Sequence, residues 1–216
     1  PPQPQVQAVV PSPGAPIPVP GAPIPGAPAE LAQPPAGNTP PAIVQRAEKA
    51  LLEAHWIEPA HGSLVLELTQ LGLVDPGNEA IPRLRKAAEA RLWPQAEKAA
   101  AAHKWDEAVA AYRVVTKLSP DNVAAREALL NALESLGRAA VRAKDYEGAL
   151  SVANEILNLG PDPKALFRPT MMRADSLHRL GRYVEARDAY RTAKKLNPRS
   201  KAAKKGYYRA SRKVQK

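Results

Sequence analysis

Apolar residues near the end of the chain recur at steps of four, three and four positions, at Ala203, Tyr207, Ala210 and Val214. Such steps place side chains on one face of an α-helix, and basic residues occupy the other faces. The pattern therefore predicts a helix with one buried and one solvated side. A helix of this kind closes a row of stacked repeats, so we expect residues 200–216 to form a basic capping helix.

A short turn signature, in which proline is followed by a helix-capping residue, recurs four times from residue 43 onward. Proline cannot continue a helix, while Asn, Asp or Ser accepts bonds from the free N–H groups that begin the next one. The prolines are Pro76, Pro120, Pro161 and Pro198, and the capping residues are Asn78, Asn122, Asp162 and Ser200. This recurring turn signature predicts repeated helix–turn–helix units, which are typical of a helical solenoid.

Alanine stands twelve residues before each of the last three prolines, and an aromatic residue stands three positions before each alanine. We expect the aromatic residue to begin the second helix of a pair, and the alanine to lie where two helices cross too closely for a larger side chain. The alanines are Ala108, Ala149 and Ala186, and the aromatic residues are Trp105, Tyr146 and Tyr183. The alanine-rich, aromatic-poor composition favours helices over strands.

These marks resemble the tetratricopeptide repeat (TPR) family, and the last copy matches the family's pattern of small, large and turn residues best. The matching residues are Ala174, Leu177, Gly181, Tyr183, Ala186, Tyr190, Ala193 and Pro198. The resemblance covers residues 43–216 and is strong over 95–200. It implies an all-α fold, a right-handed α-solenoid of about three to four TPR-like helix pairs with a C-terminal capping helix. Such domains follow proline-rich linkers in bacterial proteins.

The repeats are longer than those of the family. Successive prolines lie 44, 41 and 37 residues apart, against 34 in the family. The excesses are close to three, two and one helical turns, so we expect lengthened helices whose buried face keeps its direction. Pro94 falls inside the first helix of one pair, and we expect a kink or break there. Residues 43–76 are expected to form a degenerate pair, with Leu64 where the family has alanine.

The first 42 residues carry fifteen prolines and one charged side chain, Glu30. Proline blocks helix and sheet ladders, and scattered small apolar residues bury too little area to offset chain entropy, so we expect disorder. Two roles stay open, a spacer and a docking ligand for proline-reading domains. The expected organisation is a linker at 1–42, a degenerate pair and lead-in helix at 43–94, repeats at 95–199 and the cap at 200–216.

The net charge of +10 is concentrated at the C-terminal end, because residues 189–216 hold eleven basic side chains and no acidic one. Two interpretations stay open. The first is a solvated helix face, and the second is an anchor for a polyanion such as nucleic acid, an anionic membrane or an acidic protein segment. The candidate polyanion-binding residues are Lys194, Lys195, Arg199, Lys201, Lys204, Lys205, Arg209, Arg212 and Lys213.

In the family, the first helices of the pairs line a concave groove, and the repeat register implies which side chains face it here. They are Trp93, Glu97, Asn131, Glu134, Arg138, Arg142, Arg168, Met171, Asp175 and Arg179. The arginines suit the carboxylates of an acidic peptide, although they are equally typical of solvated helix residues. The resemblance therefore implies a non-enzymatic scaffold that binds a peptide or helix of a protein partner.

No motif for catalysis, phosphate binding or metal ligation stands out in the sequence. We therefore expect no catalytic, cofactor-binding or metal site, no cofactor and no small-molecule substrate. No apolar run approaches the ~20 residues of a transmembrane segment. The absence of cysteine excludes disulfides and suits the cytoplasm and periplasm alike, with the cytoplasm slightly favoured.

The chain begins Pro1-Pro2 without an initiator methionine. We expect it to be the C-terminal part of a longer protein, or a trimmed version of one. A third functional interpretation therefore stays open, in which the repeats form the regulatory tail of an enzyme whose catalytic domain lies upstream. It rests on analogy with multidomain bacterial proteins.

Overall fold

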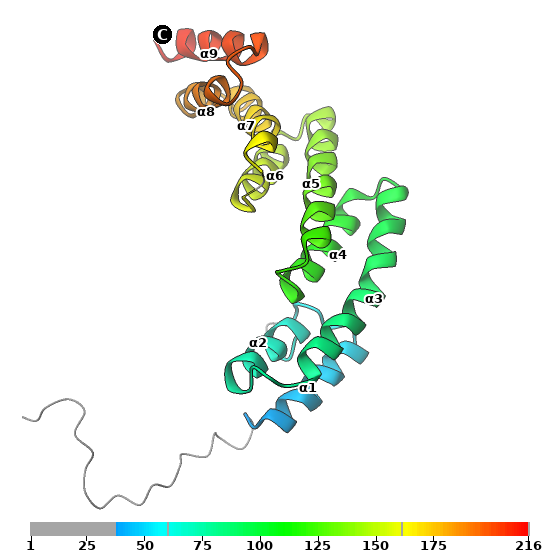
Figure 1. Ribbon diagram of the computed structural model, residues 1–216. Helices are drawn as coiled ribbons and strands as arrows, with labels where there is room; N and C mark the ends of the chain where they lie inside the picture. The colour runs from blue at the N-terminus through cyan, green and yellow to red at the C-terminus, as the bar shows by residue number, and fades with distance from the viewer. Residues whose placement is uncertain (1–37, 60, 161, 216) are drawn as a thin grey trace, which may run out of the picture.

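Helices follow one another through the computed structural model, which describes residues 38–59, 61–160 and 162–215, and they stack into a curved row (Figure 1). The α-helices are α1 Pro40–Leu52, α2 Leu64–Val74, α3 Ala80–Ala101, α4 Trp105–Leu118, α5 Val123–Ala143, α6 Tyr146–Asn158, α7 Phe167–Arg179, α8 Tyr183–Leu196 and α9 Lys201–Val214. A short 3₁₀ helix, η1 Pro163–Ala165, precedes α7. The described residues contain no strand, so the predicted all-α solenoid of helix pairs with a closing helix is confirmed.

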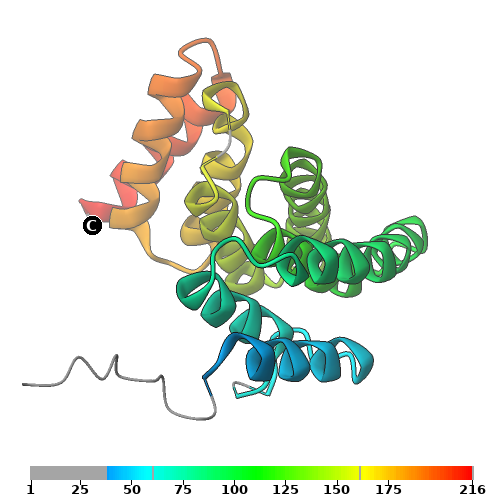
Figure 2. The ribbon, with the colours of Figure 1, turned by 60° about the horizontal axis from the view of Figure 1, so that its bottom comes forward.

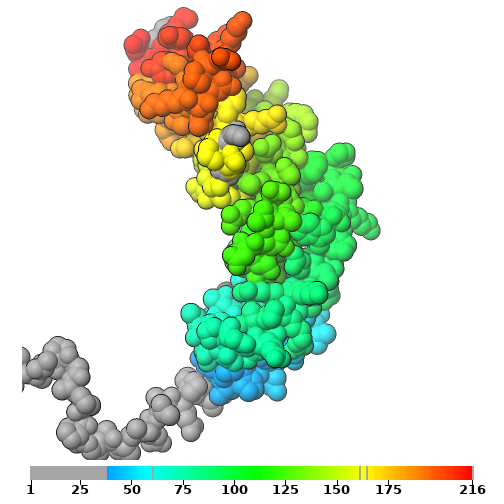
Figure 3. Space-filling model, viewed as in Figure 1, coloured from blue at the N-terminus to red at the C-terminus, as the bar shows by residue number. Residues whose placement is uncertain are grey.

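Each helix packs mainly on the helices next to it in the chain. Figure 2 shows the row with α1 and α2 at one end and α8 and α9 at the other, and Figure 3 shows its curved outline. Helices two apart in the chain also touch, since α7 contacts both α5 and α9. The molecule is therefore held together by a chain of local interfaces, as expected of a solenoid.

The predicted marks of the second helices are confirmed. Trp105, Tyr146 and Tyr183 are the first residues of α4, α6 and α8. The alanines three positions later are fully buried in all three copies, at Ala108, Ala149 and Ala186. A methyl group is the largest side chain that these tight helix crossings accommodate.

Three clusters of buried side chains form the core along the row. The first joins α1, α2, the first half of α3, the end of α4 and the start of α5, and Leu84 is among its fully buried members. The second joins α3 to α6 around Leu133, and the third joins α6 to α9 around Tyr190. Both Leu133 and the large ring of Tyr190 are wholly excluded from solvent. Burial of these side chains stabilises each interface.

The helix ends confirm part of the predicted capping. Asn122 Oδ1 accepts a hydrogen bond of 3.0 Å from the N–H of Ala125 at the start of α5. Ser200 Oγ accepts one of 3.2 Å from Ala203 at the start of α9. Asn78 is not the N-cap of α3, which is Glu79, but its side chain accepts a hydrogen bond from the N–H of Ala80, the first residue of that helix.

The prediction that Asp162 caps the next helix is wrong. The chain first makes the turn η1, and α7 begins only at Phe167. Pro169 gives the physical reason, because a proline is tolerated in the first turn of a helix but interrupts its ladder farther in. Starting at Phe167 places Pro169 third in the helix, where its missing N–H has no partner to lose.

Of the kink or break predicted at Pro94, the break is absent, since α3 runs from Ala80 to Ala101 with Pro94 inside it. A proline costs the ladder one hydrogen bond, on the order of 3 kcal/mol. Leu92 before it and Ala96 after it are both buried in the core. Burial on both sides of the proline holds the two halves in one helix.

The lengthened repeats arise mainly in the first helices. Helices α3 and α5 have 22 and 21 residues, whereas α7 has 13. In the last repeat the extra residues lie in the loop and turn before α7 instead. The first described helix, α1, begins at Pro40, three residues earlier than predicted, because prolines are accepted in a first turn. The rest of the predicted disordered linker, residues 1–37, lies outside the described residues.

Candidate binding groove on α5, α7 and α9

The face shared by α5, α7 and α9 holds two neighbouring cavities. The first, which we call the apolar cavity, has a volume of about 510 Å³. Phe167, Pro169, Met171 and Met172 of α7 supply its apolar wall. Its polar lining residues are Glu134 and Arg138 of α5, Arg168 of α7 and Ser200 at the start of α9. A cavity with an apolar wall and charged groups at a few points is typical of a site for an apolar side chain.

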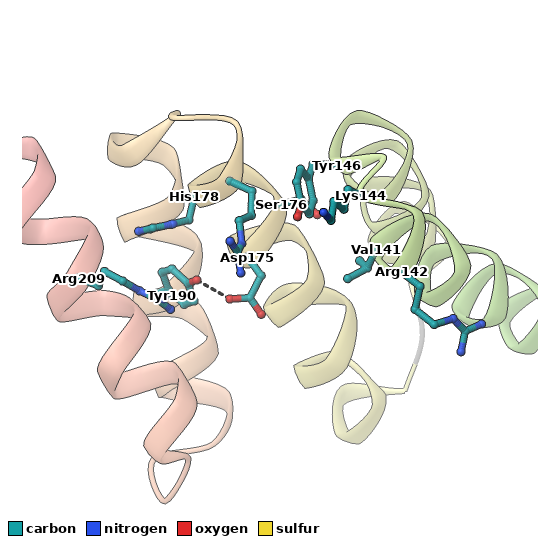
Figure 4. Close-up of a pocket in the computed structure, with 10 residues that line it drawn as sticks. Val141, Arg142, Lys144, Tyr146, Asp175, Ser176, His178, Tyr190 and Arg209 are labelled. Atoms are coloured by element: carbon teal, nitrogen blue, oxygen red, sulfur yellow. Dashed lines mark hydrogen bonds between the residues drawn. The ribbon is translucent and has the colours of Figure 1, made fainter.

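The second cavity, which we call the cationic cavity, has a volume of about 390 Å³. Its residues come from the end of α5, the start of α6, and α7, α8 and α9 (Figure 4). They are Val141, Arg142, Lys144, Tyr146, Asp175, Ser176, His178, Arg179, Tyr190 and Arg209. The two cavities follow one another along α7, because Met171 and Asp175 are one helical turn apart.

A tyrosine–aspartate hydrogen bond stands at the centre of the cationic cavity. The hydroxyl of Tyr190 donates to Asp175 Oδ1, and Figure 4 shows Arg209 of α9 beside the same tyrosine. Burial raises the pKa of the Tyr190 hydroxyl, and the negative charge of Asp175 raises it further. The hydroxyl therefore remains a donor at neutral pH, and Asp175 is held in place as the cavity's one carboxylate.

Positive charge dominates this cavity. Arg142, Lys144, Arg179 and Arg209 line it together with Asp175, and none of the four is within ion-pair distance of a carboxylate in the described part of the chain. Arg179 instead lies over the ring of Tyr146, 5.9 Å from its centroid. Guanidinium groups without a carboxylate partner are suited to binding a carboxylate or another oxyanion.

Two buried polar atoms near the cavity have no hydrogen-bond partner within the described residues, Ser176 Oγ and His178 Nε2. Burial lowers the pKa of His178, and the charges of Arg209 and Arg179 lower it further. The imidazole is therefore neutral at pH 7, and its ring packs edge-on against Tyr183. Buried polar atoms without a partner are uncommon in folded proteins, so these two mark the lining of this cavity as unusual.

The structure brings together the predicted groove residues of α5 and α7 and separates those of α3. Glu134, Arg138, Arg168 and Met171 line the apolar cavity, and Arg142, Asp175 and Arg179 line the cationic one. Glu134 and Arg168 approach to 3.8 Å, but Arg168 is 76% exposed, so this ion pair contributes little. Asn131 lines a smaller cavity beside Ile156.

Trp93 and Glu97 lie apart from this groove, on α3. The indole N–H of Trp93 donates to Glu97 Oε1 at 2.8 Å, and the ring packs edge-on against Tyr112. Trp93 also lines a separate cavity of about 480 Å³ between α3 and the start of α5. Its ring is in contact with both the first and the second core cluster, so its surroundings are mainly those of a packing residue.

Several groove residues were not predicted as such from the sequence. Tyr190 was recognised only as a repeat position, Met172 was weighed with Met171 as either a core or a partner-facing residue, and Phe167 gave no separate signal. Arg209 was assigned to the basic tail, yet in the structure it lines the cationic cavity. Its position in the capping helix, next to the buried stripe residue Ala210, was the only available hint.

The remaining tail cations lie around the last two helices. Lys194 and Lys195 are in the last turn of α8, Arg199 is in the following loop, and the others are on α9. No group of three or more metal-ligating side chains comes together in the described residues. None of the described helices is both long and apolar enough to cross a membrane.

Two family models, both described as tetratricopeptide repeat, match residues 94–165 and 171–200. No curated protein matches the sequence. Among solved structures, the Arabidopsis OM64 TPR domain is similar with 22% identity and a TM-score of 0.38, over 58% of this chain and 94% of that one. MamA AMB-1 is similar with 17% identity and a TM-score of 0.39, over 80% and 82%. The TPR2AB domain of yeast Sti1, in a complex with pHSP90, has 15% identity and a TM-score of 0.36, over 80% and 69%.

Proposed function

The chain carries a domain of the tetratricopeptide repeat family, whose members generally mediate protein–protein interactions, and from this we propose that it is a non-enzymatic interaction scaffold. Its binding site is the groove formed by the apolar and cationic cavities between α5, α7 and α9. Its ligand is a segment of a protein partner. The single observation that carries the proposal is the pairing of these two cavities on successive turns of α7.

The spacing of the cavities favours a ligand with two kinds of side chain. Met171 in the apolar cavity, Asp175 and then Arg179 in the cationic cavity are separated by four residues each. Four residues correspond to about 6 Å along a helix. An extended peptide rises about 3.3 Å per residue, so neighbouring or next-nearest side chains span that distance. The matching segment has an apolar side chain and, about one to three residues away, a carboxylate.

The charges also favour an acidic segment. Arg142, Arg179 and Arg209 outnumber Asp175 in the cationic cavity, and they have no carboxylate partner in the described structure. A ligand carboxylate would gain charge-assisted hydrogen bonds, worth about 1.5 to 3 kcal/mol each. The apolar cavity would add the burial of one side chain, about 1.5 to 3 kcal/mol. Together these terms support reversible binding of a short segment, after the entropy cost of association is subtracted.

The test compares the wild type with two variants, each of which loses three positive charges at different places. The groove variant combines Arg138→Ala, Arg142→Ala and Arg179→Ala. The control variant combines Lys98→Ala, Lys117→Ala and Arg173→Ala, which removes the same charge from exposed positions that line none of the cavities described above. Each form is used as bait in a native lysate, and captured proteins are identified by mass spectrometry.

A defined probe follows the capture experiment. A library of fluorescent octapeptides with one apolar and one acidic residue at spacings of one to four is titrated against each form, beside the same peptides with Asn or Gln in place of the acid. We expect binding that needs the acid, that is lost in the groove variant and that persists in the control. Partners or peptides that bind all three forms equally would contradict the groove assignment.

A further inference from the structure

The last two helices carry a second surface that the groove does not use. It consists of Lys194 on α8 and Lys204, Lys205, Tyr207, Tyr208 and Arg212 on α9, and we call it the tyrosine–cation surface. We propose that it binds single-stranded nucleic acid. The function is additional to peptide binding in the groove and does not depend on it.

Two tyrosines form the centre of this surface. The rings of Tyr207 and Tyr208 meet edge to face with centroids 5.7 Å apart. Tyr207 is half-buried against the third core cluster, which anchors the pair, while Tyr208 is 63% exposed. An exposed aromatic ring held by a buried neighbour is a platform on which an unpaired base can stack.

Cations surround the two rings. Lys194 Nζ lies 4.4 Å from the ring centroid of Tyr207 and 5.6 Å from that of Tyr208. The helical period places Lys204 and Lys205 one turn before Tyr208 and Arg212 one turn after it, about 6 Å away along the axis. Hydrogen bonding from Arg191 lowers the pKa of the Tyr207 hydroxyl, in keeping with the positive surroundings. Phosphates on either side of a stacked base would find a cation within reach.

Few of these cations are neutralised by a carboxylate of the described chain. Among residues 189–215, Arg191 lies 3.3 Å from Asp188, and no other basic side chain there is within ion-pair distance of a described carboxylate. Elsewhere, by contrast, Arg46 pairs with Glu67 and Arg113 with Glu155. The last two helices therefore present a concentrated positive charge with few carboxylate partners among the described residues, which suits a polyanion.

The way α9 packs favours nucleic acid over a membrane. A helix that binds a membrane surface needs a free apolar face to insert among the lipids. The apolar face of α9, formed by Ala203, Gly206 and Ala210, is buried in the interior of the fold. Its exposed face offers charges around Tyr208, the arrangement found where bases stack and phosphates pair. A single strand is favoured over a duplex because only unpaired bases expose a ring face.

The experiment measures fluorescence anisotropy of a labelled oligothymidylate titrated with the full chain at several salt concentrations. The variants are Tyr208→Ala, Tyr208→Phe and the double change Lys204→Gln with Lys205→Gln. A matched control, Lys98→Gln with Lys117→Gln, removes equal charge from exposed positions on α3 and α4. Circular dichroism and thermal unfolding verify that every variant is folded. Separate arms use a duplex, polyglutamate and phosphatidylserine vesicles.

We expect Tyr208→Ala to weaken binding about tenfold and Tyr208→Phe to preserve it, since stacking needs the ring alone. The double lysine variant should reduce the slope of log affinity against log salt by about 1.4, while the control leaves it unchanged. Equal affinity of Tyr208→Ala and the wild type, or tighter binding to duplex, polyglutamate or vesicles than to the single strand, would overturn the proposal. Absence of oligothymidylate binding at low salt would overturn it as well.

Discussion

The ring of Tyr190 on α8 lies against the backbone of Gly206 on α9 and fills the space that a Cβ at position 206 would need. This contact sets how closely the last helix approaches the one before it. The same approach brings Arg209, one turn later on α9, into the cationic cavity beside Tyr190 and Asp175. A glycine in the capping helix therefore determines the shape of the proposed binding site.

Gly206→Ala is predicted to destabilise the fold although alanine is the better helix former. The propensity gain is about 1 kcal/mol, and overpacking a well-filled contact costs about 1 to 3 kcal/mol. The Tyr190 ring is fully buried and cannot move aside, so we expect a net loss of about 1 kcal/mol in the free energy of unfolding by urea. Gly72→Ala in α2, with no atom within 4 Å of its added Cβ, is the control and should be neutral or stabilising. Equal effects of the two changes would contradict this account.

Tyr190→Phe removes the hydroxyl that Asp175 accepts from, while keeping the ring that fills the core. A hydrogen bond to a charged group contributes about 1.5 to 3 kcal/mol, and the exposure of Asp175 lets water replace part of it. We expect a loss of about 1 kcal/mol, measured by urea unfolding at pH 7. Tyr208→Phe, at an exposed ring, serves as the comparison. No difference between the two would mean that the Tyr190 hydroxyl contributes nothing to stability.

His178 should make the fold less stable in mild acid. Its pKa is lowered by burial and by Arg209, Arg179 and Lys213, with Asp175 acting in the opposite direction. The unfolded chain therefore binds a proton that the folded chain resists, and stability falls as pH drops below the ordinary histidine value of about 6.5. Chemical unfolding at pH 7, 6 and 5 should show a smaller decline for His178→Gln than for the wild type. The control His61→Gln, at an exposed loop position, should lose as much stability between pH 7 and pH 5 as the wild type does. If His178→Gln lost just as much, His178 would not be the source of the pH dependence.

Ala186→Trp tests the helix crossing in the last pair. Ala186 is fully buried, so an indole there must separate α7 from α8. We expect a cost of about 3 kcal/mol or more, seen as a lower thermal midpoint or loss of the folded state. Ala110→Trp, at an exposed position of α4, should change the midpoint little. A midpoint of Ala186→Trp equal to that of the wild type would show that the repeat register is misplaced.

The helix pairs could be predicted because their signals are local. Trp105, Tyr146 and Tyr183 begin helices because each repeat uses the same turn, and the alanine three residues later reports a crossing that the fold repeats. Asp162 does not cap α7 because a second proline, Pro169, favours a later start of that helix. The chain passes Pro94 without a break because packing outweighed a local rule. At Pro94 the burial of Leu92 and Ala96 stabilises the helix by more than the hydrogen bond that the proline removes.

The site was less predictable because it depends on distances between helices. The register placed Arg142, Asp175 and Arg179 on first helices, but it could not show that Tyr190 from a second helix donates to Asp175. It also could not bring Arg209 from the cap into the same cavity, since that requires the crossing geometry permitted by Gly206. Periodicity specifies the face of a helix, whereas a cavity depends on how several faces meet.

The packing of α9 at the end of the row has one further consequence. This helix is the last of the described row and packs on α8 extensively and on α7 at a few points, so it stands at an end of the stack, where fraying begins. Undocking it would withdraw Arg209 and uncover Tyr190, and the cationic cavity would cease to exist. Occupancy of the cavity and docking of the terminal helix are therefore thermodynamically linked, and each must strengthen the other by the same free energy. A ligand in the groove should therefore slow amide hydrogen exchange in α9. The exchange rate of this helix would then measure how much of the groove is occupied.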